Sequence, residues 1–115
     1  MADREVIQLI NEIKSQDLLQ ELVAQLSKDA DLSGLEVNFA DSVNAEKLVK
    51  QLYNVLVDLM TNDFRAYLNF LYRIDLSEQK LKSIPETEPK QIAEIVTFLV
   101  LKREWQKVVL RNKTQ

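Results

Sequence analysis

The residues from Asp29 to Gly34 have the spacing of the first half of a calcium-binding loop. Asp29, Asp31 and Ser33 would supply oxygen ligands at positions 1, 3 and 5 of such a loop, and Gly34 stands at position 6. The second half does not follow, because position 12, which needs a bidentate glutamate, is Ala40. We therefore expect a turn in which the glycine adopts a positive φ angle, rather than a calcium site.

The chain contains no histidine and no cysteine. Histidine is the commonest general base and metal ligand, and cysteine supplies thiolate nucleophiles, thiolate metal sites and disulfides. The single glycine rules out the glycine-rich loops that bind phosphate groups. The carboxylates fall mostly on polar faces of the expected helices. The sequence therefore predicts a protein that is not an enzyme, with no catalytic residue, no cofactor and no metal.

Five basic residues surround Trp105 near the C-terminus and are candidates for nucleic-acid binding: Lys102, Arg103, Lys107, Arg111 and Lys113. Two observations argue against this function. Cations near a helix C-terminus are favoured by the helix dipole. Residues 1–45 carry three basic and nine acidic side chains, and the remaining residues carry twelve and nine, so the acidic N-terminal part can pair with the basic part. Nucleic-acid binding is therefore kept only as an alternative.

Five charged residues are expected to form a structural polar cluster that joins two long helices: Asp63, Arg73, Asp75, Arg103 and Glu104. The pair predicted to meet directly is Arg73 with Glu104, with a hydroxyl from Tyr67 or Tyr72. Asp63 falls on an otherwise apolar helix face, which has two interpretations. It caps a segment after a kink at residues 61–63, or it is a buried carboxylate paired with an arginine.

The helix expected to lie at the centre of the fold covers residues 92–110. Its first ten residues contain only two polar side chains, Glu94 and Thr97, so it is apolar nearly all round. Such a helix is normally surrounded by other elements. Thr87 or Glu88 should cap it, with Pro89 in the first turn.

The apolar face of this central helix changes direction along its length, from Ile92 and Val96 toward Trp105. The N-terminal stripe from Val6 to Ile13 is expected to cover the Trp105 face. Two arrangements remain open: packing within one chain, or a homodimer. In the homodimer the interface would comprise Phe98, Leu101, Trp105 and Val108.

The first 44 residues predict a broken helix followed by an extended crossover. Asp3 is placed as the N-cap of the first helix, and a break near Ser15 would let this serine cap the second. From Lys28 to Asn44 the helical periodicity disappears, and an extended segment anchored by Phe39 is expected to cross the bundle.

A long amphipathic helix, capped by Asn44 or Ser42, is predicted to run to Ile74. A short helix begins at Ser77 and ends before Pro85. With one glycine and two prolines among 115 residues, the turn residues that sheets require are missing. The fold class is therefore predicted as all-α: one compact bundle domain, residues 1–115, of about four to five helices with a central C-terminal helix. No signal peptide or membrane-spanning run is recognised, so a soluble cytoplasmic protein is expected.

Two segments, DFRAYLNFLYRIDLSE at residues 63–78 and KREWQKVVLR at residues 102–111, suggest a relationship to other proteins. They resemble small, functionally uncharacterised bacterial all-helical proteins that carry a Leu-Tyr-Arg-Ile-Asp core and a late Arg-Glu-x-Gln-Lys element. The resemblance implies a bacterial cytosolic helical domain and transfers no activity.

The function predicted from the sequence is a non-enzymatic protein-interaction or structural module, such as a self-associating regulatory or adaptor protein. Its partner would be another protein or a second copy of the chain. Nucleic-acid binding through the basic C-terminal helix is one alternative. Binding of a small apolar ligand in a cavity between Tyr67, Tyr72 and Trp105 is another. Membrane association is not expected.

Overall fold

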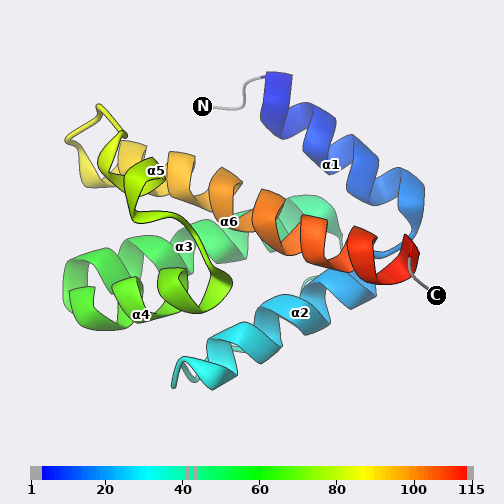
Figure 1. The fold of residues 1–115 in the computed structure, drawn as a ribbon, viewed down its shortest axis with the longest axis horizontal. Helices are drawn as coiled ribbons and strands as arrows, with labels where there is room; N and C mark the ends of the chain where they lie inside the picture. Colours follow the sequence, from blue (N-terminus) through cyan, green and yellow to red (C-terminus); the bar gives the residue numbers. More distant parts are fainter. Residues whose placement is uncertain (1–3, 41, 43, 114–115) are drawn as a thin grey trace.

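The computed structural model describes residues 4–40, 42 and 44–113, and six α-helices account for most of them (Figure 1). The helices are α1 (Arg4–Gln16), α2 (Leu19–Leu32), α3 (Ala45–Asn62), α4 (Phe64–Ile74), α5 (Glu78–Lys82) and α6 (Pro89–Lys113). These described residues contain no β-strand, so the all-α prediction is confirmed. There is one helix more than expected, because the predicted long helix is divided into α3 and α4.

Helix α6 lies at the centre of the bundle and contacts α1, α2, α3 and α4 (Figure 1). Its buried residues point to several neighbours rather than to one, which explains why its sequence is apolar on nearly every side. It begins at Pro89, where the missing N–H of proline costs no helical hydrogen bond. The Ile92 N–H donates to the Glu88 carbonyl at 3.0 Å, which places Glu88 at the cap position.

The N-terminal helix is broken as predicted, but two residues later than expected. Asp17 adopts a left-handed φ of 55° and separates α1 from α2. Ser15 does not cap α2, because its hydroxyl donates to the Glu12 carbonyl at 2.9 Å within α1. Leu18 occupies the cap position and makes no side-chain capping bond. The predicted cap at Asp3 lies outside the described residues.

Helix α2 continues to Leu32, so the prediction that helical structure ends at Lys28 was wrong. Burial of Asp29, a polar residue, interrupts the apolar periodicity without ending the helix. The helix instead ends before Gly34, whose φ of 85° is left-handed. The crossover therefore covers residues 33–44, and Phe39 anchors it with a fully buried side chain, as predicted.

Asp63 ends α3 and caps α4. Its Oδ1 accepts a hydrogen bond from the Ala66 N–H at 3.1 Å, and its side chain is exposed. The capping interpretation is thus confirmed, and the interpretation as a buried carboxylate was wrong. Asn44 caps α3 in the same way, accepting from the Lys47 N–H at 2.8 Å.

Replacing Asp63 with alanine is expected to lower the free energy of unfolding by about 1 kcal/mol, because the first turn of α4 loses its side-chain acceptor. Asp63→Asn keeps an acceptor at this position and should retain most of the stability. Urea denaturation followed by the fluorescence of Trp105, the single tryptophan, measures both variants. Equal losses in the two variants would contradict the capping role.

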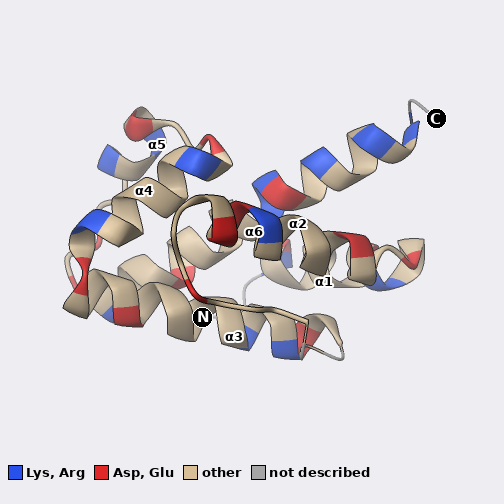
Figure 2. Cartoon of the chain, turned by 90° about the horizontal axis from the view of Figure 1, so that it is seen from below, with Lys and Arg blue, Asp and Glu red and all other residues tan. Residues whose placement is uncertain are grey.

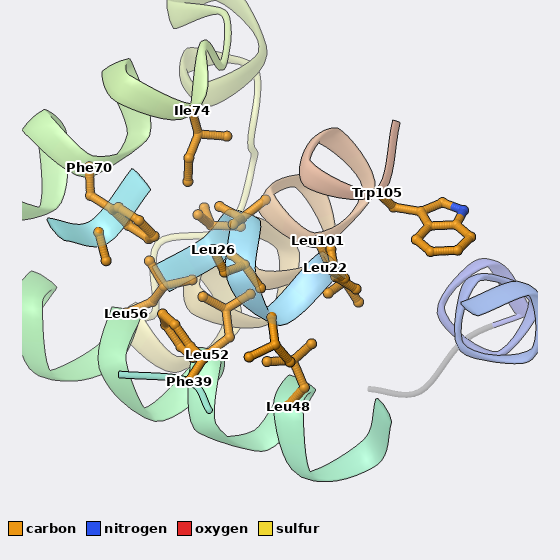
Figure 3. Close-up of a cluster of buried hydrophobic side chains, with 14 of the residues drawn as sticks. Leu22, Leu26, Phe39, Leu48, Leu52, Leu56, Phe70, Ile74, Leu101 and Trp105 are labelled. Atoms are coloured by element: carbon orange, nitrogen blue, oxygen red, sulfur yellow. The ribbon is translucent and has the colours of Figure 1, made fainter. Parts of the chain in front are cut away.

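The buried side chains form one continuous core between the helices (Figure 3). It is built from leucines of α2 and α3, from α4, α6 and the crossover: Leu22, Leu26, Leu48, Leu52, Leu56, Phe70, Ile74, Leu101 and Phe39. None of the described helices combines the length and apolar content that a membrane span requires.

Candidate functional site

Three of the four residues predicted as a dimer interface lie in the core of a single chain. Leu101, Trp105 and Val108 are each at most 3% exposed, whereas Phe98 is half-buried. The indole of Trp105 lies beside α1 (Figure 3), and its Nε1–H donates to the Glu12 carboxylate. The N-terminal stripe therefore covers Trp105 within one chain. Of the two arrangements left open, the structure shows packing within one chain, in which α1 and the core cover Leu101, Trp105 and Val108 and leave Phe98 half-buried.

Helix α1 is attached mainly through its C-terminal half. Ile13 is its one buried residue, and Glu12 reaches Trp105 of α6. Lys14 forms an ion pair with Glu46 of α3, and this hydrogen bond lowers the pKa of Glu46 below its ordinary value. In the N-terminal half of α1, Leu9 is half-buried and Ile7 keeps 49% of its surface accessible. This half of α1 therefore forms one wall of an open depression.

Three adjoining hollows meet at Phe98, and we call them together the Phe98 groove. Two of them, of about 420 and 340 Å³, lie between α1 and α6 and share Glu5 and Phe98. The third, of about 370 Å³, lies between α1, α3 and α6. Along α6 the groove extends from Gln91 to Gln106, which corresponds to roughly 22 Å of helix.

The walls of the Phe98 groove are mostly apolar side chains from three helices: Val6, Leu9, Val49, Tyr53, Ile95, Phe98, Leu99, Leu101 and Trp105. The hydroxyl of Thr97, which also lines it, donates to the Ala93 carbonyl at 2.6 Å and is therefore already satisfied. The Lys102 ammonium lies 5.7 Å from the centre of the Phe98 ring, a cation–π contact. The groove offers apolar surface for binding.

A separate cluster of charged side chains is buried between α2 and α6. Glu104 is fully buried and Asp29 is 4% exposed. Lys107 lies between them, with its Nζ 3.1 Å from Asp29 Oδ2 and 2.9 Å from Glu104 Oε2. Gln25 donates to Asp29 at 3.0 Å and accepts from Arg111, also at 3.0 Å. Two carboxyl groups thus share one nearby ammonium group.

The two carboxyl groups of this cluster have opposite pKa shifts. Burial and a hydrogen bond with Asp29 raise the pKa of Glu104 to about 8, although Lys107 opposes the shift. Burial also disfavours ionisation of Asp29, but hydrogen bonds from Glu104, Gln25 and Lys107 outweigh it and lower the pKa of Asp29. A pKa of about 8 keeps Glu104 largely protonated at neutral pH. Glu104 has no accessible surface, so its carboxyl group is closed off from solvent in this structure.

This buried cluster was not predicted, although two spacings point toward it. Gln25 and Asp29 are four residues apart, and Glu104 and Lys107 are three apart, so each pair shares a helix face. Both pairs are ordinary on a solvated surface. Their burial depends on the packing of α2 against α6, which local periodicity does not reveal.

The predicted polar cluster is only partly assembled. Arg103 forms an ion pair with Asp75 at 3.3 Å and thereby connects α6 to the end of α4. Glu104 faces Asp29 and Lys107 instead of Arg73, which is exposed, so the predicted pair was wrong. Arg73 and Glu104 carry suitable charges, but the packing of α6 directs Glu104 toward α2.

The aromatic residues proposed to enclose a ligand have separate surroundings. The Tyr67 ring lies 5.4 Å from that of Phe64, and burial raises the pKa of Tyr67 to about 12. Tyr72 is exposed, and its hydroxyl donates to Glu78 at 3.1 Å rather than to the predicted cluster. Trp105 lies against α1. The predicted cavity between Tyr67, Tyr72 and Trp105 is therefore not formed.

The calcium-like run forms the end of a helix rather than a ligand loop. Asp29 is helical and bound to Lys107, while Asp31 is exposed on the last turn of α2. The Gly34 N–H donates to the Asp31 carbonyl at 3.0 Å, which completes the helix end. The positive φ angle expected for Gly34 is confirmed. Within the described ranges, no cluster of three or more acidic side chains is arranged to hold a metal ion.

Basic side chains follow successive turns of the C-terminal part of α6 (Figure 2). Three of them have partners in the same chain: Arg103 with Asp75, Lys107 with Asp29 and Glu104, and Arg111 with Gln25. Among these contacts, the Lys107–Asp29 ion pair joins the acidic N-terminal part to the basic part.

Comparisons with protein-family models, with curated proteins and with solved structures found no match to this chain. The resemblance to small bacterial helical proteins therefore stays a prediction, and the function must be argued from the geometry.

Proposed function

We propose that this protein is a non-enzymatic interaction module that binds a helical segment of a partner protein in the Phe98 groove. The observation that carries the proposal is the length of the groove combined with its apolar walls. A depression that follows α6 for roughly 22 Å matches about four turns of a second helix. A compact metabolite would occupy only one of its three hollows.

Recognition of a helix in a groove depends on apolar anchor residues spaced three, four and seven positions apart. The three hollows along α1, α3 and α6 can each receive one anchor side chain. Phe98 borders all three hollows, and its side chain is half-buried when no partner protein is bound. It should therefore contribute most to binding. Aromatic residues at the centre of an interface are common binding hot spots.

Nucleic-acid binding through α6 is less well supported than the interaction module. Arg103, Lys107 and Arg111 are already paired with groups of the same chain. Neutralising phosphates with these residues would require breaking those contacts. The net charge of −3 also opposes association with a polyanion.

Selection from a displayed library of helix-biased peptides tests the proposed function. We expect enriched peptides to carry apolar residues three and four positions apart and to compete with one another for one site. Phe98→Ala should weaken their binding at least roughly tenfold, because truncating an interface hot spot costs about 2 kcal/mol or more, and about 1.4 kcal/mol is already tenfold. Calorimetric titration with each enriched peptide measures the change.

Phe64→Ala is the matched control, since Phe64 is a 56% exposed phenylalanine on α4, outside the groove. It should leave peptide binding unchanged. Peptides that bind Phe98→Ala as tightly as the natural sequence would contradict the proposal. Light scattering separates a further outcome: a dimer that Phe98→Ala converts to monomer would identify the occupant as a second copy of the chain.

A further inference from the structure

The charged side chains around the Phe98 groove are predominantly carboxylates. Five glutamates line it: Glu5, Glu12, Glu46, Glu86 and Glu94. Only two cations do so, Lys50 and Lys102, which leaves an excess of three negative charges (five minus two). The molecule as a whole has the same net charge of −3 spread over 115 residues. Negative charge is therefore concentrated at the groove.

Not every carboxylate of the groove contributes equally to this excess. Glu46 is already neutralised by its ion pair with Lys14, which reduces the excess from three negative charges to two. Glu12 accepts from the indole N–H of Trp105, which is uncharged and does not neutralise it. Oε1 of Glu86 is buried at the edge of the groove without a hydrogen-bond partner in the described structure. A ligand cation that reached Glu86 would supply the missing donor.

Another hollow of the same molecule has the opposite charge balance. It lies between α6 and the end of α4 and borders the Phe98 groove, with which it shares Lys102. Its described lining residues include the cations Lys80, Lys102 and Arg103 and the carboxylate Asp75. Acidic lining is thus a property of the Phe98 groove rather than of every depression on this surface.

Resting on the function proposed above, we infer that the partner segment is a cationic amphipathic helix. Its apolar face occupies the Phe98 groove, and its flanking lysine or arginine side chains pair with Glu5, Glu12 and Glu86. Charged groups around an apolar contact set the orientation and choice of partner more than the affinity. An anionic helix with the same apolar face is rejected, because it brings like charges together at the groove.

Two synthetic helices of about 18 residues test this inference. Both carry leucines at the same positions, and their polar positions are all lysine in one peptide and all glutamate in the other. We expect the Leu/Lys peptide to bind at least roughly tenfold more tightly than the Leu/Glu peptide in calorimetric titration at low salt. The difference should shrink as salt screens the charges.

A charge-neutralising variant locates the effect. Replacing Glu5, Glu12 and Glu86 together with glutamine should weaken binding of the Leu/Lys peptide by about tenfold, since three charge pairs with the peptide are lost. Glutamine at position 12 still accepts from Trp105, so the fold is preserved. The matched control, Asp31→Asn with Glu36→Gln and Asp58→Asn, removes the same charge from exposed carboxylates elsewhere and should leave binding unchanged.

The possible results separate this inference from the proposed function. Equal binding of both peptides, abolished by Phe98→Ala, overturns the charge preference and leaves the interaction module in place. Equal weakening of Leu/Lys peptide binding by the groove variant and by its control also overturns the charge inference. The net charge of the protein would then account for the preference, and the carboxylates of the groove would have no special role. If neither synthetic peptide binds but the displayed library yields Phe98-dependent binders, the charge inference alone is overturned. If neither peptide binds and the library yields no such binders, both proposals are overturned.

Discussion

Raising the pH from about 5 to about 8 is expected to destabilise the protein progressively through ionisation of Glu104. The pKa of this buried carboxyl group is raised from 4.5 to about 8 in the folded state. Between these values the folded chain holds a proton that the unfolded chain has released. The stabilising contribution is complete below pH 4.5, decreases by roughly 1 kcal/mol per pH unit, and is lost above about pH 8.

Asp29 has the opposite effect at acidic pH. Its pKa is lowered below 3.8 in the folded state, because hydrogen bonds from Glu104, Gln25 and Lys107 outweigh its burial. Its stabilising contribution is therefore present above pH 3.8 and lost as the pH falls through its lowered folded pKa. Together the two carboxyl groups place the greatest stability of this cluster in mildly acidic solution.

Glu104→Gln isolates the contribution of Glu104. The glutamine amide is uncharged at every pH and can donate to Asp29 as the protonated acid does. We expect the variant to lose the alkaline decline and to exceed the natural sequence by a few kcal/mol near pH 8. Urea denaturation at several pH values, followed by Trp105 fluorescence, measures both proteins. Glu36→Gln, at an exposed site, should give a curve parallel to that of the natural sequence. Parallel curves for Glu104→Gln as well would mean that Glu104 is ionised at neutral pH.

The parts of the fold that the sequence predicts well are those fixed by local chemistry. An apolar helix without a polar face must be surrounded, and α6 is in contact with four other helices. Pro89 and Asp63 have strong preferences for the start of a helix, and both occupy that position. The end of α2 was predicted too early, because aspartate is common in turns and Asp29 interrupts the apolar pattern. Its buried position in the helix depends on the ion pair with Lys107, which is distant in the sequence.

The candidate site depends on contacts between distant residues, which explains why it was missed. Glu104 could pair with Arg73 or Lys107 by charge alone, and only the rotation of α6 against α2 directs it to Asp29 and Lys107. Phe98 is the one residue of the predicted interface that the structure leaves half-buried. Its neighbours Leu101 and Trp105 share the same helix face, but the core covers Leu101 and α1 covers Trp105. Hydrophobic periodicity gives the face of a helix, not the position at which a covering helix begins.

Trp105→Ala is expected to lower the free energy of unfolding by about 3–5 kcal/mol and to release α1 first. The indole is 3% exposed and provides both apolar contact and the hydrogen bond to Glu12. Helix α1 otherwise contacts the bundle through buried Ile13, half-buried Leu9 and Ile10, and the Lys14–Glu46 ion pair, so Trp105→Ala removes one of its few attachments. Hydrogen exchange should therefore show α1 amides losing protection while the amides of α3 and the middle of α6 keep theirs.

Trp105→Phe separates packing from the hydrogen bond. It keeps an aromatic ring beside α1 but removes the N–H donor, and Glu12 is exposed enough to bind water instead. We expect this variant to lose about 1–2 kcal/mol and to keep α1 protected. Because α1 forms one wall of the Phe98 groove, peptide binding should survive in Trp105→Phe and fail in Trp105→Ala, even though both retain Phe98. Uniform loss of protection across all helices of Trp105→Ala would instead mean that α1 unfolds only with the whole chain, and that the groove is as stable as the core.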